Sequence, residues 1–338
     1  MLSAVSGGYD PHNSRRNSIR ALTASLDDGK THLLLACSGS VATIKLPNII
    51  QALSKYPSSQ LSVRVVLTPS ASRFLAGQSK EQPTISGISS LPNVDAYVIF
   101  FLYSQGKCGM KIAIVGRHTH LWQYIDADEW KVPWVRGAGI LHIELRRWAD
   151  VLVIAPLSAN TLAKIVGGFS DSLLTSVVRA WDPWGELDAS PAPVETASTA
   201  DKTDPATQET ATVIPMTQDG IDGATRNRRL RKRRIIVAPA MNTAMWRHPI
   251  TAKQLRVLEE EWGVQGTPDP AQPNDGSAPG NPATLQENGA SQDEGDGWFE
   301  VLRPQSKVLA CGDAGDGAML EWSQIVTVIE QRLELGAQ

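Results

Sequence analysis

Three residues of different chemical type stand out, and they lie far apart in the chain. His142 is one helical turn from Arg146, Asn242 follows a short apolar run, and Cys311 opens a glycine-rich stretch that ends at Gly317. The pKa of a histidine near neutrality suits proton transfer, and an amide can donate hydrogen bonds to a carboxylate. Three glycines around a thiol and an acid are typical of a loop that can close. Each residue also has a purely structural interpretation, as a capping histidine, a turn-stabilising asparagine or an inert buried cysteine.

Polar residues also follow three predicted strands, where each strand ends. The polar segments cover 38–40, 68–70 and 156–161. Because ligands of open parallel sheets bind beyond the carboxyl ends of the strands, three such segments favour a single bound cofactor. Backbone N–H groups at a helix start suit a phosphate, and Gly39 lets the backbone approach it closely. Ordinary turns and an N-cap at Ser158 are the alternative, and no G-x-G-x-x-G motif indicates a dinucleotide.

Short apolar runs alternate along the chain with segments of helical period. Leu141, Leu145 and Trp148, for example, recur at the i, i+4, i+7 spacing of an amphipathic helix, and Thr251 is placed to cap a later one. The predicted strands cover residues 31–36, 61–67, 151–155, 235–238 and 308–310. Two predicted helices cover 141–148 and 251–262, and four others end near residues 53, 166, 180 and 335. This alternation predicts an α/β fold, with a doubly wound parallel sheet covered by helices on both faces.

Four segments depart from the pattern. Residues 1–30 are expected to be a disordered tail, and 183–225 and 267–297 to be disordered loops, because they are rich in small, polar and proline residues. The segment 98–121 groups aromatic residues without a period, as a buried hairpin or a retained intron would, and sequencing the transcript distinguishes these. Without these segments, one domain remains within 31–338.

Composition excludes several classes of protein. The 338 residues carry 32 Lys and Arg against 35 Asp and Glu, so a general nucleic-acid binder is not expected. The basic run at 226–234 is interpreted as a solvated charge cluster rather than a nuclear-localisation or nucleic-acid site. Three widely spaced cysteines form neither a disulfide framework nor a metal knuckle, which favours a reducing compartment. No apolar stretch approaches the ~20 residues of a spanning helix, so we expect a cytoplasmic protein without membrane contact.

Six segments in one order carry a resemblance to a known family. They are GSVATIKLP (39–47), HIELRRWAD (142–150), APLSANTLAKI (155–165), SDSLLTSVVRAWD (170–182), APAMNTAMW (238–246) and LACGDAGDGAM (309–319). Together they resemble the FMN-dependent cysteine decarboxylases, and most closely the branch that converts 4′-phosphopantothenoylcysteine to 4′-phosphopantetheine in coenzyme A synthesis. The resemblance does not cover the tail, the two predicted loops or residues 98–121.

The resemblance implies a Rossmann-like, flavodoxin-type fold. It also implies a homotrimer, or a heterotrimer with a paralogue, that holds FMN and substrate at subunit interfaces. His142 would promote oxidation of the substrate's cysteinyl moiety by FMN, and Cys311 would deliver the final proton. The implied substrate contacts are Asn242, Arg147, Gly312, Asp313, Gly315, Gly317, Ala318 and Met319. The implied FMN contacts are Gly39, Ser40, Val41, Thr68, Ser70, Ser158, Ala159, Asn160, Thr161 and Ala240. No metal is implied.

Two features depart from the family pattern. Pro69 removes an N–H between Thr68 and Ser70. The segment 98–121 precedes an acidic, aromatic segment at 126–130, which resembles family sequence near the active site, and an insert there could disturb the trimer or the substrate entrance.

Two rival functions remain. Halotolerance-type regulators that inhibit a protein phosphatase resemble this domain, but they carry a long acidic C-terminal tail, whereas this sequence ends with Gly336-Ala337-Gln338. Decarboxylation of a peptide's C-terminal cysteine is the alternative within the family, and the segments at 238–246 and 309–319 favour the phosphopantothenoyl substrate.

Overall fold

Most of the predicted elements are present in the computed structural model. It describes residues 19, 22–79, 82–97, 136, 138–185, 187, 232–264, 297–308 and 314–336.

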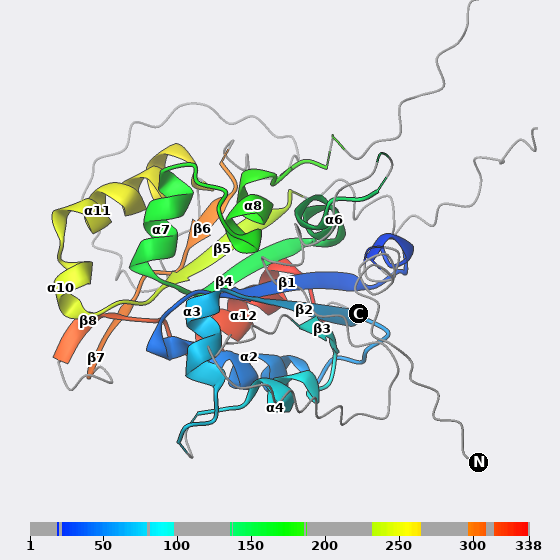
Figure 1. Ribbon diagram of the computed structural model, residues 1–338, viewed down its shortest axis with the longest axis horizontal. Helices are drawn as coiled ribbons and strands as arrows, with labels where there is room; N and C mark the ends of the chain where they lie inside the picture. Colours follow the sequence, from blue (N-terminus) through cyan, green and yellow to red (C-terminus); the bar gives the residue numbers. More distant parts are fainter. Residues whose placement is uncertain are drawn as a thin grey trace, which may run out of the picture.

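Six parallel strands form one sheet (Figure 1). The strands are β1 (Thr31–Cys37), β2 (Leu61–Leu67), β3 (Val94–Tyr97), β4 (Val151–Leu157), β5 (Arg234–Pro239) and β6 (Phe299–Val301). Their spatial order is β3-β2-β1-β4-β5-β6, so the winding reverses between β1 and β4. Without the edge strand β3, the remaining five follow the flavodoxin order 2-1-3-4-5. The predicted doubly wound sheet is confirmed.

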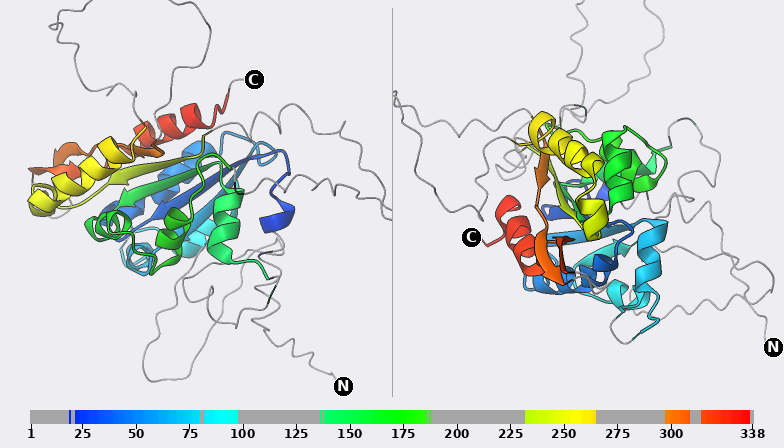
Figure 2. Two further views of the ribbon diagram at one scale, coloured as in Figure 1. Left: turned by 90° about the horizontal axis from the view of Figure 1, so that it is seen from above. Right: turned by 90° about the vertical axis from the view of Figure 1, so that its left-hand side faces the viewer.

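Helices cover both faces of this sheet (Figures 1 and 2). One face packs against α2 (Leu46–Leu53), α3 (Pro69–Ser72), α4 (Ile85–Ser89) and α12 (Trp322–Arg332). The other face packs against α6 (Leu141–Trp148), α7 (Ala159–Val166), α8 (Leu173–Arg179) and α11 (Pro249–Arg256). Short helical turns join them: η1 (Val41–Lys45), η2 (Arg73–Leu75), α10 (Thr243–Trp246) and η4 (Val257–Glu261).

The apolar runs are continuous because both sides of each central strand are buried. In β1, Leu33 and Leu35 face the α2 and α12 layer, while Leu34 and Ala36 face the α6 and α7 layer. All four side chains are fully buried. Such burial fixes the register of the strand, since a shift by one residue would exchange the two faces.

The last predicted strand, at 308–310, has the wrong partner, and its residues 309 and 310 lie outside the described residues. Residues 305–308 form β7 (Gln305–Val308), which pairs antiparallel with β8 (Ala314–Ala318) in a separate two-stranded sheet. The strand beside β5 is instead β6, which the sequence pattern did not reveal. Part of the glycine-rich stretch is therefore a strand, where a flexible loop was predicted.

The predicted cap of the 251–262 helix is also wrong. Pro249 occupies the first turn of α11, where its missing N–H costs no hydrogen bond. The helix therefore starts earlier, and the ring of His248 accepts a hydrogen bond from Ile250 N–H at 3.2 Å. Thr251 lies inside the helix and donates its hydroxyl to Met245 O at 2.6 Å.

The fold begins before residue 31, so the predicted tail at 1–30 is too long. Leu22 is fully buried in the layer that contains Trp148. The buried His32 ring lies 3.0 Å from Asp28 Oδ1 and 3.0 Å from Trp148 O, which ties the segment before β1 to the end of α6. Residues 22–30 therefore belong to the domain.

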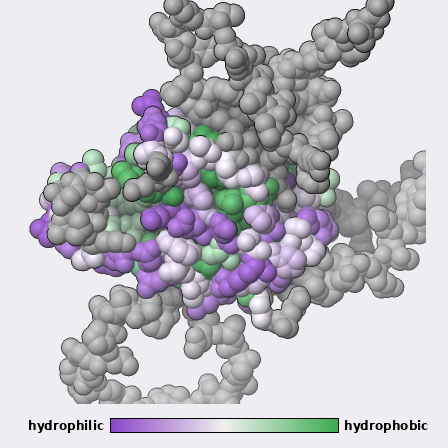
Figure 3. Space-filling model, turned by 90° about the horizontal axis from the view of Figure 1, so that it is seen from below, coloured by the Kyte–Doolittle hydropathy of each residue, from purple (hydrophilic) through white to green (hydrophobic). Residues whose placement is uncertain are grey.

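Several predictions fall on residues that the structure does not describe. These are the insert at 98–121, the segment at 126–130, most of the loops at 183–225 and 267–297, and Cys311, Gly312 and Asp313. Among the described helices, none has the length and apolar character needed to cross a bilayer. The face in Figure 3 carries hydrophilic and hydrophobic residues side by side.

Candidate functional site

The loops after β1 and β2 touch each other at the carboxyl edge of the sheet. A Cβ on Gly39 would lie 2.6 Å from Ser70 Cβ, so only glycine allows this approach. Thr68 caps α3 by accepting from Ala71 N–H at 3.3 Å, and its hydroxyl lies 3.2 Å from Ser70 Oγ. Pro69 sits in the first turn of α3, where an N–H has no helical partner. The proline is therefore no obstacle to this loop.

The loop after β1 is also joined to the loop after β4. Ser38 is fully buried, and its hydroxyl donates to Pro156 O at 3.0 Å and accepts from Ser158 N–H at 2.7 Å. Ser158 caps α7, because its Oγ accepts from Thr161 N–H at 3.4 Å. The N-cap interpretation of Ser158 is confirmed, and the residue lies at the carboxyl edge of the sheet, where a cofactor contact stays a prediction.

The loop after β5 lies beside the loop after β4. The loops after β2, β1, β4 and β5 therefore form one row at the carboxyl edge of the sheet, called here the row of loops. Ala240 N–H donates to Leu157 O at 2.9 Å, which places it beside the β4 loop. Asn242 caps α10 with its Oδ1, which accepts from Met245 N–H at 2.8 Å. Its exposed side chain therefore has its NH₂ group left to donate to a ligand.

The hairpin of β7 and β8 closes the row. Met241 N–H donates to Gly317 O at 2.9 Å. Gly317 packs against the backbone of Met241 and Gly315 against the side chain of Thr243, and in both cases a Cβ would collide with these neighbours. Two of the predicted glycine contacts are therefore placed directly against the Asn242 loop.

Asp316 fixes the hairpin to α10. Its Oδ2 accepts from Arg247 Nη2 at 3.0 Å and its Oδ1 from Ser306 Oγ at 2.9 Å. The Arg247 guanidinium, followed by the Ser306 hydroxyl, holds the pKa of the Asp316 carboxyl below its usual range.

Two other predicted contacts on this hairpin have packing roles. Ala318 pairs with Gln305 in the hairpin. Met319 is buried in the core cluster that also contains Ala240 and residues of α12.

His142 and Arg147 are not brought to the row of loops within one chain. Both lie on α6, whose end is fixed near the start of β1 and β4, since Asp150 N–H donates to His32 O at 2.9 Å. Figure 1 shows α6 and α10 toward opposite ends of the sheet. Arg147 Nη1 lies 3.4 Å from Glu144 Oε1 on the same helix.

The row of loops is suited to a phosphate-bearing cofactor. It combines backbone donors at the start of α7, hydroxyls of Ser70 and Thr68, and a place at Gly39 where a Cβ would not fit. The predicted contacts Val41 and Asn160 are exposed at this same edge, and Ser40 is half-buried. The buried Cys37, in contrast, donates its thiol to Ala155 O at 3.0 Å, and burial raises its pKa, so it is no nucleophile at neutral pH.

Ser38 was predicted as part of the polar segment 38–40, but the hydrogen bonds that its side chain makes within the chain were not predicted. The available signal was a small hydroxyl directly between an apolar strand and a glycine, but only the structure shows its partners, which lie 118 and 120 residues away in the sequence.

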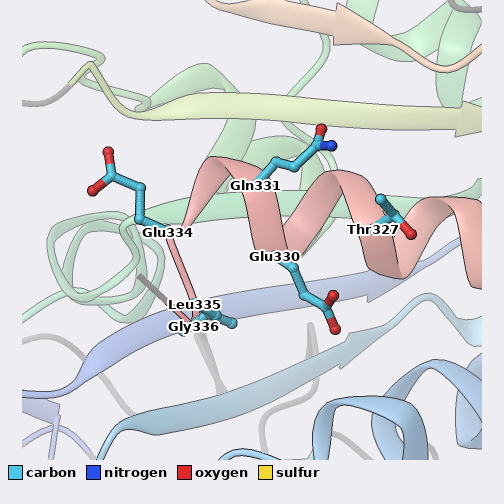
Figure 4. Close-up of a pocket in the computed structure, with 6 residues that line it drawn as sticks. All are labelled: Thr327, Glu330, Gln331, Glu334, Leu335 and Gly336. Carbon is cyan, nitrogen blue, oxygen red and sulfur yellow. The ribbon is translucent and has the colours of Figure 1, made fainter. Parts of the chain in front are cut away.

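A separate surface hollow lies at the end of α12, lined by Thr327, Glu330, Gln331, Glu334, Leu335 and Gly336. Its polar side chains diverge (Figure 4), so it is no candidate binding site.

Known proteins are similar to this chain over nearly its whole length. A probable phosphopantothenoylcysteine decarboxylase of Arabidopsis thaliana is 31% identical over 301 residues, which are 89% of this chain and 87% of that protein. Phosphopantothenoylcysteine decarboxylase subunit SIS2 of Saccharomyces cerevisiae is 29% identical over 91% of this chain and 41% of its own length. This chain spans less than half of that relative, and about a third of two other fungal relatives.

A solved structure and a family model agree with this. HAL3 from Cryptococcus neoformans has a TM-score of 0.50 and 28% identity, and the match covers 92% of this chain and all of that one. The family model described as Flavoprotein matches residues 22–191 and 216–334. These ranges include the loops after β1, β2, β4 and β5, the helix of His142 and the hairpin, so the chain belongs to the Flavoprotein family.

Proposed function

We propose that this protein is an FMN-dependent decarboxylase that converts 4′-phosphopantothenoylcysteine to 4′-phosphopantetheine in coenzyme A synthesis. The observation that carries the proposal is the continuous row of loops at the carboxyl edge of β2, β1, β4 and β5, which ends at the hairpin of β7 and β8. The names of the similar Arabidopsis and yeast proteins support the substrate and the reaction.

The loops after β1, β2 and β4 would hold FMN. Its phosphate suits the backbone donors of the β1 loop and the start of α7, as phosphates commonly bind at helix N-termini. The contacts are those predicted at Gly39, Ser40, Val41, Thr68, Ser70, Ser158, Ala159, Asn160, Thr161 and Ala240. When bound, FMN would take two electrons from the cysteinyl moiety and later return them, so that no net oxidation occurs.

The protein's own side chains would handle the carboxylate and the protons. The NH₂ group of Asn242 would donate to the substrate carboxylate and keep it oriented until CO₂ leaves, with the electrons passing to the thiocarbonyl. His142 would take part in proton transfer during oxidation, a role that histidine side chains commonly have in catalysis. Cys311 would donate the proton that completes the product. Arg147 carries a positive charge that suits an anionic group of the substrate.

Because α6 lies away from the loops of its own chain, a second copy would complete the site with its His142 and Arg147. A closed homotrimer satisfies this need, since each interface then joins one row of loops to one α6. The word subunit in the name of the yeast relative supports the alternative of a heterotrimer with a paralogue. A cytoplasmic location stays a prediction.

The test is turnover of 4′-phosphopantothenoylcysteine by the purified chain loaded with FMN. We expect 4′-phosphopantetheine from the wild type, and an oxidised, decarboxylated intermediate from Cys311→Ser, because the last proton donor is absent. A chain that binds FMN and assembles, yet gives no product, would contradict the proposal and favour the phosphatase-inhibitor function.

A further inference from the structure

One buried hydroxyl connects the two strands where the sheet reverses its winding. The regular pairing of β1 with β4 ends at Ala36 and Ile154. Beyond it, Pro156 has no N–H to offer to a strand ladder. The connection is made instead by Ser38, whose N–H and hydroxyl both donate to Pro156 O at 3.0 Å.

The same hydroxyl fixes the start of α7. Ser158 N–H donates to Ser38 Oγ at 2.7 Å, so this donor is already used. The N–H of Thr161 is satisfied by Ser158 Oγ. The first-turn donors left for a ligand are therefore those of Ala159 and Asn160, and their direction depends on where Ser38 holds Ser158.

Ser38 also stands directly before the β1 loop. Its carbonyl accepts from the buried Thr43 Oγ1 at 3.2 Å, which ties it to η1, and Gly39 follows it at the contact with Ser70. The fully buried hydroxyl of Ser38, together with its backbone N–H, thus joins two loops that come from distant parts of the sequence.

We propose that Ser38 is a positioning residue that holds the β1 loop and the start of α7 at the separation that binds the FMN phosphate. This inference rests on the proposed function, because it assumes FMN as the ligand. Ser38 does not contact FMN: both hydrogen-bonding roles of its hydroxyl are taken within the chain. Its loss would leave the N–H of Ser158 buried without a partner, and the loop would shift to satisfy it.

The test compares the affinities of two flavins that differ only in the phosphate. Dissociation constants for FMN and riboflavin are measured by flavin fluorescence for the wild type and for Ser38→Ala, Ser38→Thr and Ser176→Ala. Ser176 is a matched control, because its buried hydroxyl is also hydrogen-bonded, but on α8 and to Ser170.

We expect Ser38→Ala to weaken FMN binding about ten-fold and riboflavin binding much less. The reason is that the displaced N–H groups at the start of α7 would contact only the phosphate, which riboflavin lacks. Ser38→Thr restores the hydroxyl and recovers most of the FMN affinity. Ser176→Ala leaves the affinity for both flavins unchanged.

The outcomes separate the two proposals. If the wild type binds FMN and Ser38→Ala weakens both flavins equally, or neither, the positioning role is wrong and the proposed function stands. If the wild type binds no FMN, both are wrong.

A second measurement needs neither flavin nor a variant. In flavin-free wild type, the amide of Ser158 should resist hydrogen exchange as strongly as the amides of β4, because its acceptor is a fully buried hydroxyl. Exchange as fast as in an exposed turn would overturn the role of Ser38, even if Ser38→Ala fails to fold.

Discussion

At the scale of single residues, Asn242 divides the two ends of its amide between the fold and the proposed substrate. Its Oδ1 caps α10, and its NH₂ group remains for a carboxylate. The sequence presented these as competing interpretations, and in the structure they are compatible. Ser158 repeats the pattern, since it caps α7 and stands in the row of loops. Single-residue patterns therefore located these positions well, because both roles require a polar side chain where a strand gives way to a helix.

Asn242→Asp separates the two roles. Aspartate caps a helix as well as asparagine does, so the free energy of unfolding should change by less than about 0.5 kcal/mol. The variant has no NH₂ donor and places a negative charge opposite the substrate carboxylate. We expect kcat/KM to fall about 100-fold, because a hydrogen bond to a charged group is replaced by repulsion. Steady-state kinetics and urea denaturation measure both effects, and full activity in this variant would show that Asn242 does not hold the carboxylate.

At the scale of elements, the central strands were predictable and the edges were not. Runs such as 151–155 are apolar on both faces, which is typical of a buried parallel strand. The three residues of β6 are too few to form a pattern, and they are a strand only because β5 lies beside them. β8 was missed because its sequence contains two glycines, which are uncommon in strands, and contacts with the α10 region stabilise it instead.

A buried ion network ties β5 and β6 to α12. Glu300 accepts two hydrogen bonds of 2.9 Å from Arg332, and Arg234 Nη1 lies 3.3 Å from its Oε2. Glu300→Gln would remove the buried carboxylate charge that pairs with both arginines. We expect a loss of about 3 kcal/mol in the free energy of unfolding, measured with urea.

The control for this variant is Glu259→Gln, which breaks the exposed pair with Arg303 and should cost less than about 1 kcal/mol. Equal losses in the two variants would refute the role of the buried network.

The contact of Asp316 with Arg247 should give the hairpin a pH dependence. Because the pKa of Asp316 is lowered in the folded protein, its contribution is present above the usual range of aspartate and is lost as the pH falls through the lowered value. We expect the β8 amides of Asp316→Asn to exchange faster than those of the wild type at neutral pH. The difference should vanish in acid, and a difference that is independent of pH would contradict the assignment.

At the scale of the whole molecule, the location of α6 explains why sequence alone did not assemble the site. The segments that contain His142, Asn242 and Cys311 could be recognised from the sequence. Their spacing along the chain, however, does not predict that His142 lies away from the row of loops of its own chain. The two helices α6 and α10 are separated because they lie toward opposite ends of the sheet (Figure 1). The resemblance to known decarboxylases implied a site at subunit interfaces, and this assembly stays a proposal, because residue spacing within one chain does not show how copies meet.

Mixing two inactive variants tests the shared site. His142→Asn and Cys311→Ser should each lack normal turnover, because each removes one partner from every site. When the two chains are coexpressed, a site that takes His142 from one subunit and Cys311 from another is intact in about a quarter of random pairings. Recovery of about that fraction of wild-type activity is expected, and a mixture as inactive as the single variants would place both residues in one chain.

The central claim is that the loops meet to form one FMN site, and the most direct measurement of it is the FMN content of purified Gly39→Ala. A Cβ at this position would lie 2.6 Å from Ser70 Cβ, so the β1 and β2 loops must move apart. The control is Gly87→Ala, whose Cβ would meet only Thr84 Oγ1 at 3.1 Å on α4. We predict stoichiometric FMN in the wild type and in Gly87→Ala, and little or none in folded Gly39→Ala. Undiminished FMN in Gly39→Ala would contradict the site described above.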